Sequence, residues 1–130
     1  MFTQNLTPRF CETDALGHIN NTVLPVWFEQ AREPIFYIFN PEIDLQKWQL
    51  IIARIEVEFL KQLRYGQDVE LRTWLEKVGN SSMYIHHEAW QSGQLCARGK
   101  AILIHYDYVS EKAVPIPDHV RVKLSEHLEG

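Results

Sequence analysis

Apolar residues between positions 20 and 39 recur every three or four residues, which is typical of one buried face of an α-helix. This stripe consists of Val23, Val26, Trp27, Ala31, Ile35 and Ile38. Asn20 or Asn21 can cap the first turn, where Pro25 is tolerated because that turn has no intrahelical donor bonds to lose. Pro34 lies in the second half, where its missing N–H predicts a kink or a tightened turn. The pattern predicts one strong helix over residues 20–39.

After position 41 the pattern changes to runs rich in Ile, Val, Leu, Tyr and Trp, which favour β-strands. Four consecutive strands are predicted, over residues 50–63, 68–78, 83–91 and 94–108. The turns between them, at residues 65–67, 79–81 and 92–93, are short enough for hairpins. Residues 2–11 alternate only in part and contain Pro8, so they predict an edge strand or the lead into one.

The first of these four strands has one apolar and one polar face. Ile55, Val57 and Phe59 alternate with Glu56 and Glu58, which predicts that the apolar side is buried. The whole pattern predicts an α+β fold, in which one long central helix packs on a strongly curved antiparallel sheet of about five strands. No repeat or linker divides the chain, so residues 1–130 are expected to form a single domain.

The composition narrows the class of protein. A hydrophobic share of 45% with 23% charged residues indicates a globular protein, and the net charge of −4 argues against a nonspecific nucleic-acid binder. Cys11 and Cys96 are far apart and form no CxxC motif, so a disulfide or zinc scaffold has little support. The chain shows no secretory signal pattern and no apolar run of roughly 20 residues, so we expect a soluble, cytoplasmic protein that does not bind a membrane.

Polar groups concentrate between the first predicted strand and the helix, where residues 14–21 read DALGHINN. A carboxylate such as Asp14, placed before a helix, faces unpaired backbone donors that can also stabilise an oxyanion on a substrate. Gly17 would let the backbone bend so that these donors approach a ligand. The plainer interpretation gives Asp14 and the Asn residues only capping roles, and the segment alone does not decide between the two.

Three stretches of the chain are distinctive: residues 9–21 read RFCETDALGHINN, residues 27–32 read WFEQAR, and residues 64–69 read RYGQDV. Together with the turn at residues 79–82, they resemble the 4-hydroxybenzoyl-CoA thioesterase family of hotdog proteins, in the same order and over nearly the whole chain. The resemblance implies a hotdog fold and hydrolysis of a fatty-acyl or aryl thioester to the free acid and CoA. It implies no metal and no cofactor, because CoA is part of the substrate.

The resemblance also assigns the chemistry to particular atoms. The family's catalytic aspartate corresponds to Asp14, which would either attack the thioester carbonyl or activate a water molecule as a general base. The family's oxyanion donor corresponds to the backbone N–H of Asn21 at the start of the helix. His18 and Asn20 match as well, as residues that shape the turn or contact the substrate. Ser82 matches a position near the active site of a neighbouring subunit, although it could equally be a polar turn residue.

A pocket for the acyl group is expected between the helix and the strand predicted over residues 50–63. Its apolar lining would come from Val23, Trp27, Ile55, Val57 and Phe59. Lys61, Arg64 and Arg98 offer phosphate contacts for CoA, but scattered basic residues on an acidic protein are usually solvated surface. No metal site is predicted, because the adjacent His86 and His87 of a strand point to opposite faces.

Three alternatives follow from the same residues. The leading one is an acyl-CoA thioesterase built as a homodimer or homotetramer, because pairing two protomers removes an exposed edge strand. The second keeps the fold but dehydrates or hydrates an acyl thioester, with His18 as the candidate residue. The third is an acyl-thioester binding module without turnover, and an intact motif around Asp14 argues against it.

Overall fold

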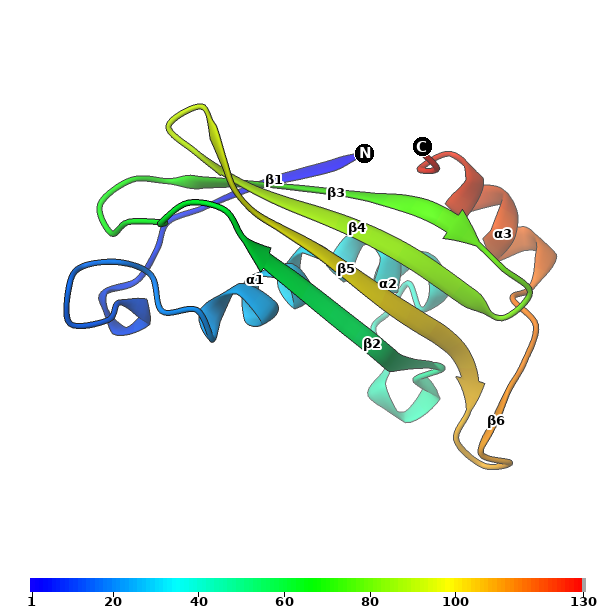
Figure 1. Cartoon of the computed structure of the whole chain (residues 1–130). Coiled ribbons are helices and arrows are strands. Elements are labelled where there is room, and N and C mark those ends of the chain that lie inside the picture. The colour runs from blue at the N-terminus through cyan, green and yellow to red at the C-terminus, as the bar shows by residue number, and fades with distance from the viewer. Residues whose placement is uncertain (130) are drawn as a thin grey trace.

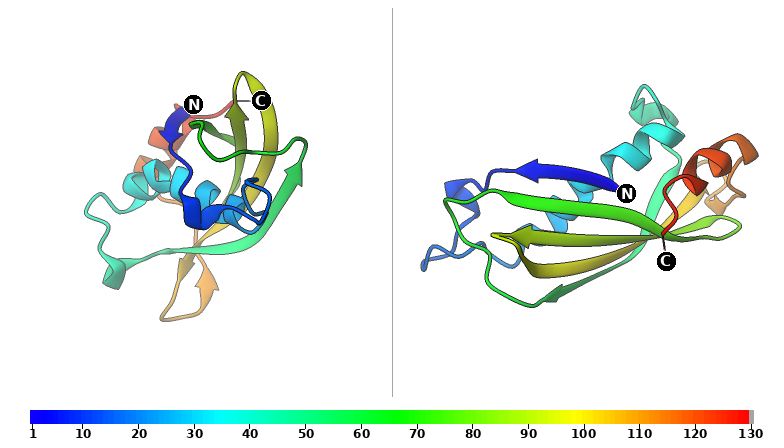
Figure 2. Two further views of the ribbon diagram at one scale, coloured as in Figure 1. Left: turned by 90° about the vertical axis from the view of Figure 1, so that its left-hand side faces the viewer. Right: turned by 90° about the horizontal axis from the view of Figure 1, so that it is seen from above.

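The computed structural model describes residues 1–129, which form one curled antiparallel sheet around two short helices (Figures 1 and 2). The strand order is β1-β3-β4-β5-β2, and the short β6 pairs with the end of β5. The strands are β1 (Phe2–Leu6), β2 (Leu50–Phe59), β3 (Val69–Val78), β4 (Ser82–Gln91), β5 (Gln94–Asp107) and β6 (Lys112–Ala113). All of these pairings are antiparallel, so the predicted α+β arrangement and its five main strands fit the hotdog fold.

The predicted long helix is two helices. The first is α1 (Val23–Ala31) and the second is α2 (Glu33–Phe39). Arg32 lies between them and is both the C-cap of α1 and the N-cap of α2. Pro34 is the second residue of α2, where its missing N–H costs little because a first turn has free donors. The expected disturbance at Pro34 is therefore present, but as a break rather than a kink in one continuous helix.

A third helix, α3 (Asp118–Ser125), was not predicted and packs beside α2 and β3. It is short and carries only two buried residues, Val120 and Leu124, so its apolar pattern is weak. None of the helices within residues 1–129 is long and apolar enough to cross a membrane.

The buried stripe of α1 and α2 differs in part from the predicted one. It consists of Leu24, Trp27, Phe28, Ala31, Ile35 and Phe39. Val26 is 58% exposed, because it lies on the other side of α1 from these residues. Gly99 of β5 lets α1 come close to the sheet: a Cβ added there would lie 2.7 Å from the ring of Phe28.

Strand β2 is an edge strand, and its apolar face is only half covered. Ile55 pairs with Ala101, Val57 with Gly99 and Phe59 with Ala97, and these β5 partners belong to the face that carries α1. The prediction that this side of β2 faces inward is correct, but the prediction that it is buried is wrong. Ile55 is 50% exposed and Phe59 is 54% exposed, because β2 has a neighbour on one side only.

Candidate active site

The segment that leads into the Asp14 loop is fixed to α1 by a buried carboxylate. Glu12 ends a short 3-10 turn and is 7% exposed. Its carboxylate accepts hydrogen bonds from the indole N–H of Trp27 at 2.8 Å and from the backbone N–H of Arg9 at 2.7 Å. Its backbone carbonyl accepts a bond from the N–H of Asn20 at 2.8 Å. Glu12 therefore holds both ends of the Asp14 loop and connects them to the helix.

The Asp14 carboxylate uses one of its oxygen atoms to close its own loop. Oδ1 accepts hydrogen bonds from the backbone N–H groups of Leu16 at 2.7 Å and His18 at 3.1 Å. Gly17 has φ +79°, a backbone conformation that residues with a side chain rarely adopt, and it permits this tight turn. Within residues 1–129, Oδ2 of Asp14 accepts no hydrogen bond; the Nδ1 of His18 lies 4.0 Å away. The turn-forming interpretation of Asp14 is thus correct for one oxygen and leaves the other available.

Asp14 and Asn21 line the same cleft, which has a volume of about 500 Å³. The remaining walls are Ile19, Leu24, Phe59, Leu60, Lys61, Gln62 and Leu63. The backbone N–H of Asn21 has no acceptor within the described part of the chain, and it lies just before the positive end of α1. A free carboxylate oxygen and a free N–H donor therefore share one cleft with both polar and apolar walls, as acyl transfer at a carbonyl requires.

The other residues of the predicted turn have structural contacts. Asn20 accepts hydrogen bonds from the N–H of Thr22 at 3.0 Å and from its hydroxyl at 2.9 Å, so it orders the entry into α1. His18 forms a β-bridge with Arg64, and the carbonyl of Gly17 accepts a bond from the N–H of Tyr65 at 3.1 Å. These contacts fasten the Asp14 loop to the segment that follows β2.

Three predicted substrate contacts lie away from this cleft in a single chain. Trp27 is 3% exposed, and its indole lies in the core, where its N–H donates to the carboxylate of Glu12. Val57 packs against the core beneath α1. Ser82 starts β4 opposite Ile104, whereas Phe59 of the cleft pairs with Ala97 on the same strand β5. Seven residues of β5 separate these two points, roughly 23 Å at the rise of a strand.

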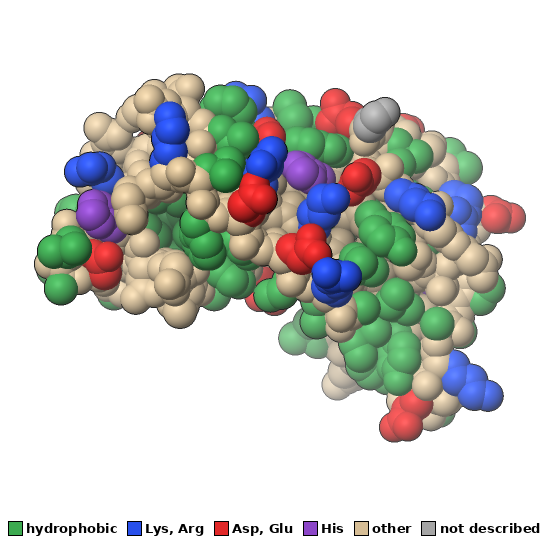
Figure 3. Space-filling view, in the orientation of Figure 1, with side chains coloured by type: hydrophobic (Ala, Val, Ile, Leu, Met, Phe, Trp, Pro, Cys, Tyr) green, Lys and Arg blue, Asp and Glu red, His purple; other side chains and the backbone are tan. Residues whose placement is uncertain are grey.

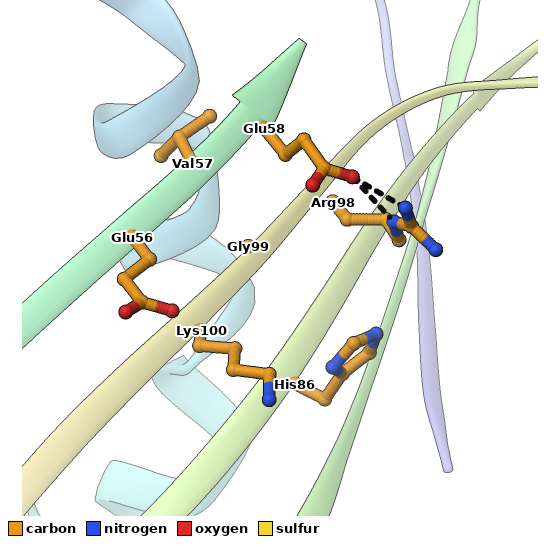
Figure 4. Close-up of a pocket in the computed structure, with 7 residues that line it drawn as sticks. All are labelled: Glu56, Val57, Glu58, His86, Arg98, Gly99 and Lys100. Carbon is orange, nitrogen blue, oxygen red and sulfur yellow. Dashed lines mark hydrogen bonds and ion pairs between the residues drawn. The ribbon is translucent and has the colours of Figure 1, made fainter. Parts of the chain in front are cut away.

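A second cavity, of about 530 Å³, lies on the outer face of the sheet (Figure 4). Its lining consists of Glu56, Val57, Glu58, His86, Arg98, Gly99 and Lys100. Arg98 is bound to Glu58 here, and acidic and basic side chains alternate over this face of the molecule (Figure 3). His86 faces this side whereas His87 is buried on the inner side, as predicted for adjacent residues of a strand. The residues that line this cavity come from β2, β4 and β5, and none of them belongs to a helix.

Glu12 had no role predicted from the sequence, and Lys61 was named only among three scattered basic residues that offer phosphate contacts. Glu12 stands within the motif but is separated from Trp27 by 15 residues, so their contact depends on the 3-10 turn that brings them together. Lys61 lies in the cleft beside Asp14, where it is the only basic residue among those that line it.

Replacing Glu12 with Gln is expected to lower the free energy of unfolding by about 1–3 kcal/mol, because one of two buried donors would face an amide NH₂. Burial raises the pKa of Glu12, but the hydrogen bonds from Arg9 and Trp27 outweigh it, so the pKa lies below its ordinary value. A lowered pKa means that Glu12 stabilises the fold at neutral pH, and that this contribution disappears as the pH falls through the lowered pKa. Urea unfolding between pH 3 and pH 7 measures both effects. The exposed Glu126→Gln is the control, and equal curves for the two variants would contradict the assignment.

The fold agrees with comparisons to known proteins. The structure is similar to that of a predicted thioesterase from Bacillus stearothermophilus, with 44% sequence identity and a TM-score of 0.96 over 98% of this chain and 96% of that one. It is also similar to a Thermus thermophilus thioesterase whose crystal structure contains coenzyme A and zinc, with 27% identity and a TM-score of 0.82 over 95% of this chain and 91% of that one. The uncharacterized protein YsmA of Bacillus subtilis is 26% identical over 95% of this chain and 84% of its own length.

The thioesterase-like superfamily matches residues 8–124, a range that begins before the Asp14 loop and ends within α3. A curled antiparallel sheet, a helix that begins beside a free carboxylate, and this match lead to one conclusion. The chain belongs to the thioesterase-like superfamily and has its hotdog fold.

Proposed function

We propose that the protein is an acyl-CoA thioesterase, which hydrolyses a fatty-acyl or aryl thioester to the free acid and CoA. The observation that carries this proposal is the pairing of groups in one cleft: the Oδ2 of Asp14 and the N–H of Asn21 have no partner within residues 1–129. The apolar walls of the cleft suit an acyl or aryl group. The superfamily and the CoA-bound Thermus relative favour a CoA thioester over other esters.

The chemistry would take place at the thioester carbonyl. As a general base, Asp14 would take a proton from a water molecule, and the resulting hydroxide would add to the carbonyl carbon. As a nucleophile, Asp14 would form a mixed anhydride that water then hydrolyses. In both routes the N–H of Asn21 would donate to the oxyanion, the C–S bond breaks, and the CoA thiolate takes up a proton. The net reaction consumes one water molecule and needs no metal or redox cofactor.

A second copy of the chain would complete the cleft. Phe59 and Leu60 form part of its wall and are 54% and 42% exposed; Phe59 is the last residue of the edge strand β2, and Leu60 follows it. Pairing of β2 with β2 of a second copy would satisfy the unpaired backbone groups of that edge and cover these side chains. We therefore propose a homodimer, or a homotetramer made of two such dimers. Ser82 would then reach a site only from a neighbouring copy. Cytoplasmic localisation and the absence of nucleic-acid and membrane partners remain part of the proposal.

Steady-state hydrolysis of an acyl-CoA panel tests the proposed function. The panel contains short, medium, long and aromatic acyl groups, and free thiol release is followed for each. We expect turnover of at least one member by the wild type without added metal. If no member is hydrolysed while CoA or its thioesters still bind, the protein is a binding module and the proposal is wrong.

A further inference from the structure

One side of α1, continued by the residues that flank it, faces the edge strand β2. Asn21, Pro25, Phe28 and Arg32 follow one another at steps of four, three and four residues, which places them on one stripe. Asn21 lines the Asp14 cleft together with Phe59 of β2. The other three residues line a small cavity of about 10 Å³, whose remaining walls are Ile55, Glu56, Val57, His87 and Lys100. The two spaces thus follow each other along the seam between α1 and β2, with Asp14 at one end and Arg32 at the other.

Arg32 is a buried guanidinium without an acid. It is 5% exposed, and within residues 1–129 no carboxylate oxygen lies within 4.0 Å of it. Its one hydrogen bond goes to the Nε2 of His87 at 3.3 Å, and its buried Nε has no acceptor. Glu29, one turn earlier on α1, acts on Arg32 only through its charge. A buried cation normally has a paired anion, because an isolated one is costly to remove from water.

His87, the side chain that is hydrogen-bonded to Arg32, is neutral rather than acidic. Burial and the neighbouring Arg32 hold the pKa of His87 well below its ordinary value, so the imidazole carries no charge at neutral pH. Since a guanidinium only donates, Nε2 of His87 must accept, and its Nδ1 then donates to the hydroxyl of Thr73 at 2.9 Å. The stacked ring of Phe28, 4.9 Å from that of His87, holds the imidazole in place. His87 therefore orients Arg32 but leaves its charge unpaired.

A second copy paired through β2 would bring apolar side chains to this side of the sheet. The inward residues of β2 near the seam are Ile52, Ile55, Val57 and Phe59. The acids of β2, Glu56 and Glu58, point to the outer face, where they are bound to Arg54 and Arg98. Figure 4 shows the difference: Val57 points toward the helix, and Glu58 points toward Arg98. The missing anion is thus not expected from the strand of a partner.

We propose that the substrate itself supplies the anion: its acyl group carries a carboxylate at the end remote from the thioester, and Arg32 binds this carboxylate. This inference rests on the proposed thioesterase function and names the substrate class, the CoA thioesters of dicarboxylic acids. The cavity beside Arg32 has room for about one water-sized group, so only the narrow, unbranched end of a linear chain could bring a carboxylate oxygen to Arg32.

The length of α1 sets the length of the acyl chain. Nine residues separate Val23 from Arg32, which corresponds to about 13 Å along the helix axis. The Arg32 side chain leans back toward the start of the helix, as side chains on helices do, and this shortens the span. We therefore expect medium chains such as adipoyl, suberoyl and sebacoyl to reach Arg32, and succinyl to be too short.

The test compares suberoyl-CoA with octanoyl-CoA, which have equal chain lengths and differ by the distal carboxylate. For the wild type we expect kcat/KM to be at least tenfold higher for suberoyl-CoA, as one charged hydrogen-bonded contact predicts. In Arg32→Met this ratio should fall below one. Arg72→Gln, on the outer face beside Trp90, is the control and should keep the wild-type ratio.

Three outcomes would overturn the inference. The first is a wild type for which kcat/KM is no lower with octanoyl-CoA than with any of the dicarboxylyl-CoAs. In that case the thioesterase function still stands. A wild-type preference that survives in folded Arg32→Met would show that another group binds the carboxylate. If Arg32→Met instead turns an oligomer into a monomer and the wild type shows no preference, the anion comes from a second copy. If Arg32→Met does not fold, the wild-type comparison over the four dicarboxylyl lengths decides.

Discussion

Asp14→Asn is expected to lower kcat for thioester hydrolysis by about a hundredfold or more while the protein stays folded. The amide oxygen of Asn can still accept the N–H bonds of Leu16 and His18 that close the loop. The atom in the place of Oδ2 becomes an NH₂ group, which neither attacks a carbonyl nor takes a proton from water. The loss should therefore appear in kcat, with little change in the binding of a CoA ligand.

The matched control is Asp107→Asn. Asp107 also closes its own turn, by accepting a bond from the N–H of Val109 at 2.9 Å, but it lies at the end of β5 away from the cleft. Thiol release by both variants and the wild type, together with their melting temperatures, separates a chemical role from turn formation. Undiminished hydrolysis by folded Asp14→Asn would remove Asp14 from the mechanism.

Ile52→Lys is expected to convert a dimer of this chain into monomers, with a dissociation constant raised by a factor of a hundred or more, about 3 kcal/mol. Ile52 is 48% exposed on the inward side of β2, next to the free edge of the sheet. An inward-pointing Lys on an edge strand is a device by which proteins prevent strand pairing, because pairing would remove the charge from water. Ile52 does not line the Asp14 cleft, so the change acts on assembly first.

Light scattering during size-exclusion chromatography measures the mass of each variant over a range of concentrations. Val122→Lys on α3 is the control, because Val122 is 65% exposed and lies away from β2. A wild type that is monomeric at high concentration would contradict pairing through β2. So would an Ile52→Lys variant that keeps the mass of the wild type.

The sequence was sufficient for the sheet, because strands show a period of two that a single chain reveals. It was not sufficient to show that the helix is interrupted. The apolar spacing continues past Arg32, although one helix ends and the next begins there. It also could not show how far Ile55 and Phe59 are covered. Alternation says which side of a strand faces inward, whereas coverage depends on how far the helices extend over the edge.

The same distinction holds for the site. Asp14 and Asn21 were predicted together and line one cleft, because both belong to a short continuous segment. The contact between Glu12 and Trp27, and that between Arg32 and His87, join residues 15 and 55 positions apart. Such contacts depend on how the helices and strands pack against one another, and the apolar pattern of a single sequence does not reveal this packing.

The register shift in β2 makes one residue of that strand different from its neighbours. Ile52 pairs with Leu103 and Arg54 with Ile102, so Ala53 is an extra residue without a partner of its own. Loss of Ala53 would restore regular pairing and leave every other side chain of β2 on its present side. Bulges also add twist. Relatives that lack this extra residue would keep the same inner lining yet bend this edge differently, and so alter the angle at which two copies meet.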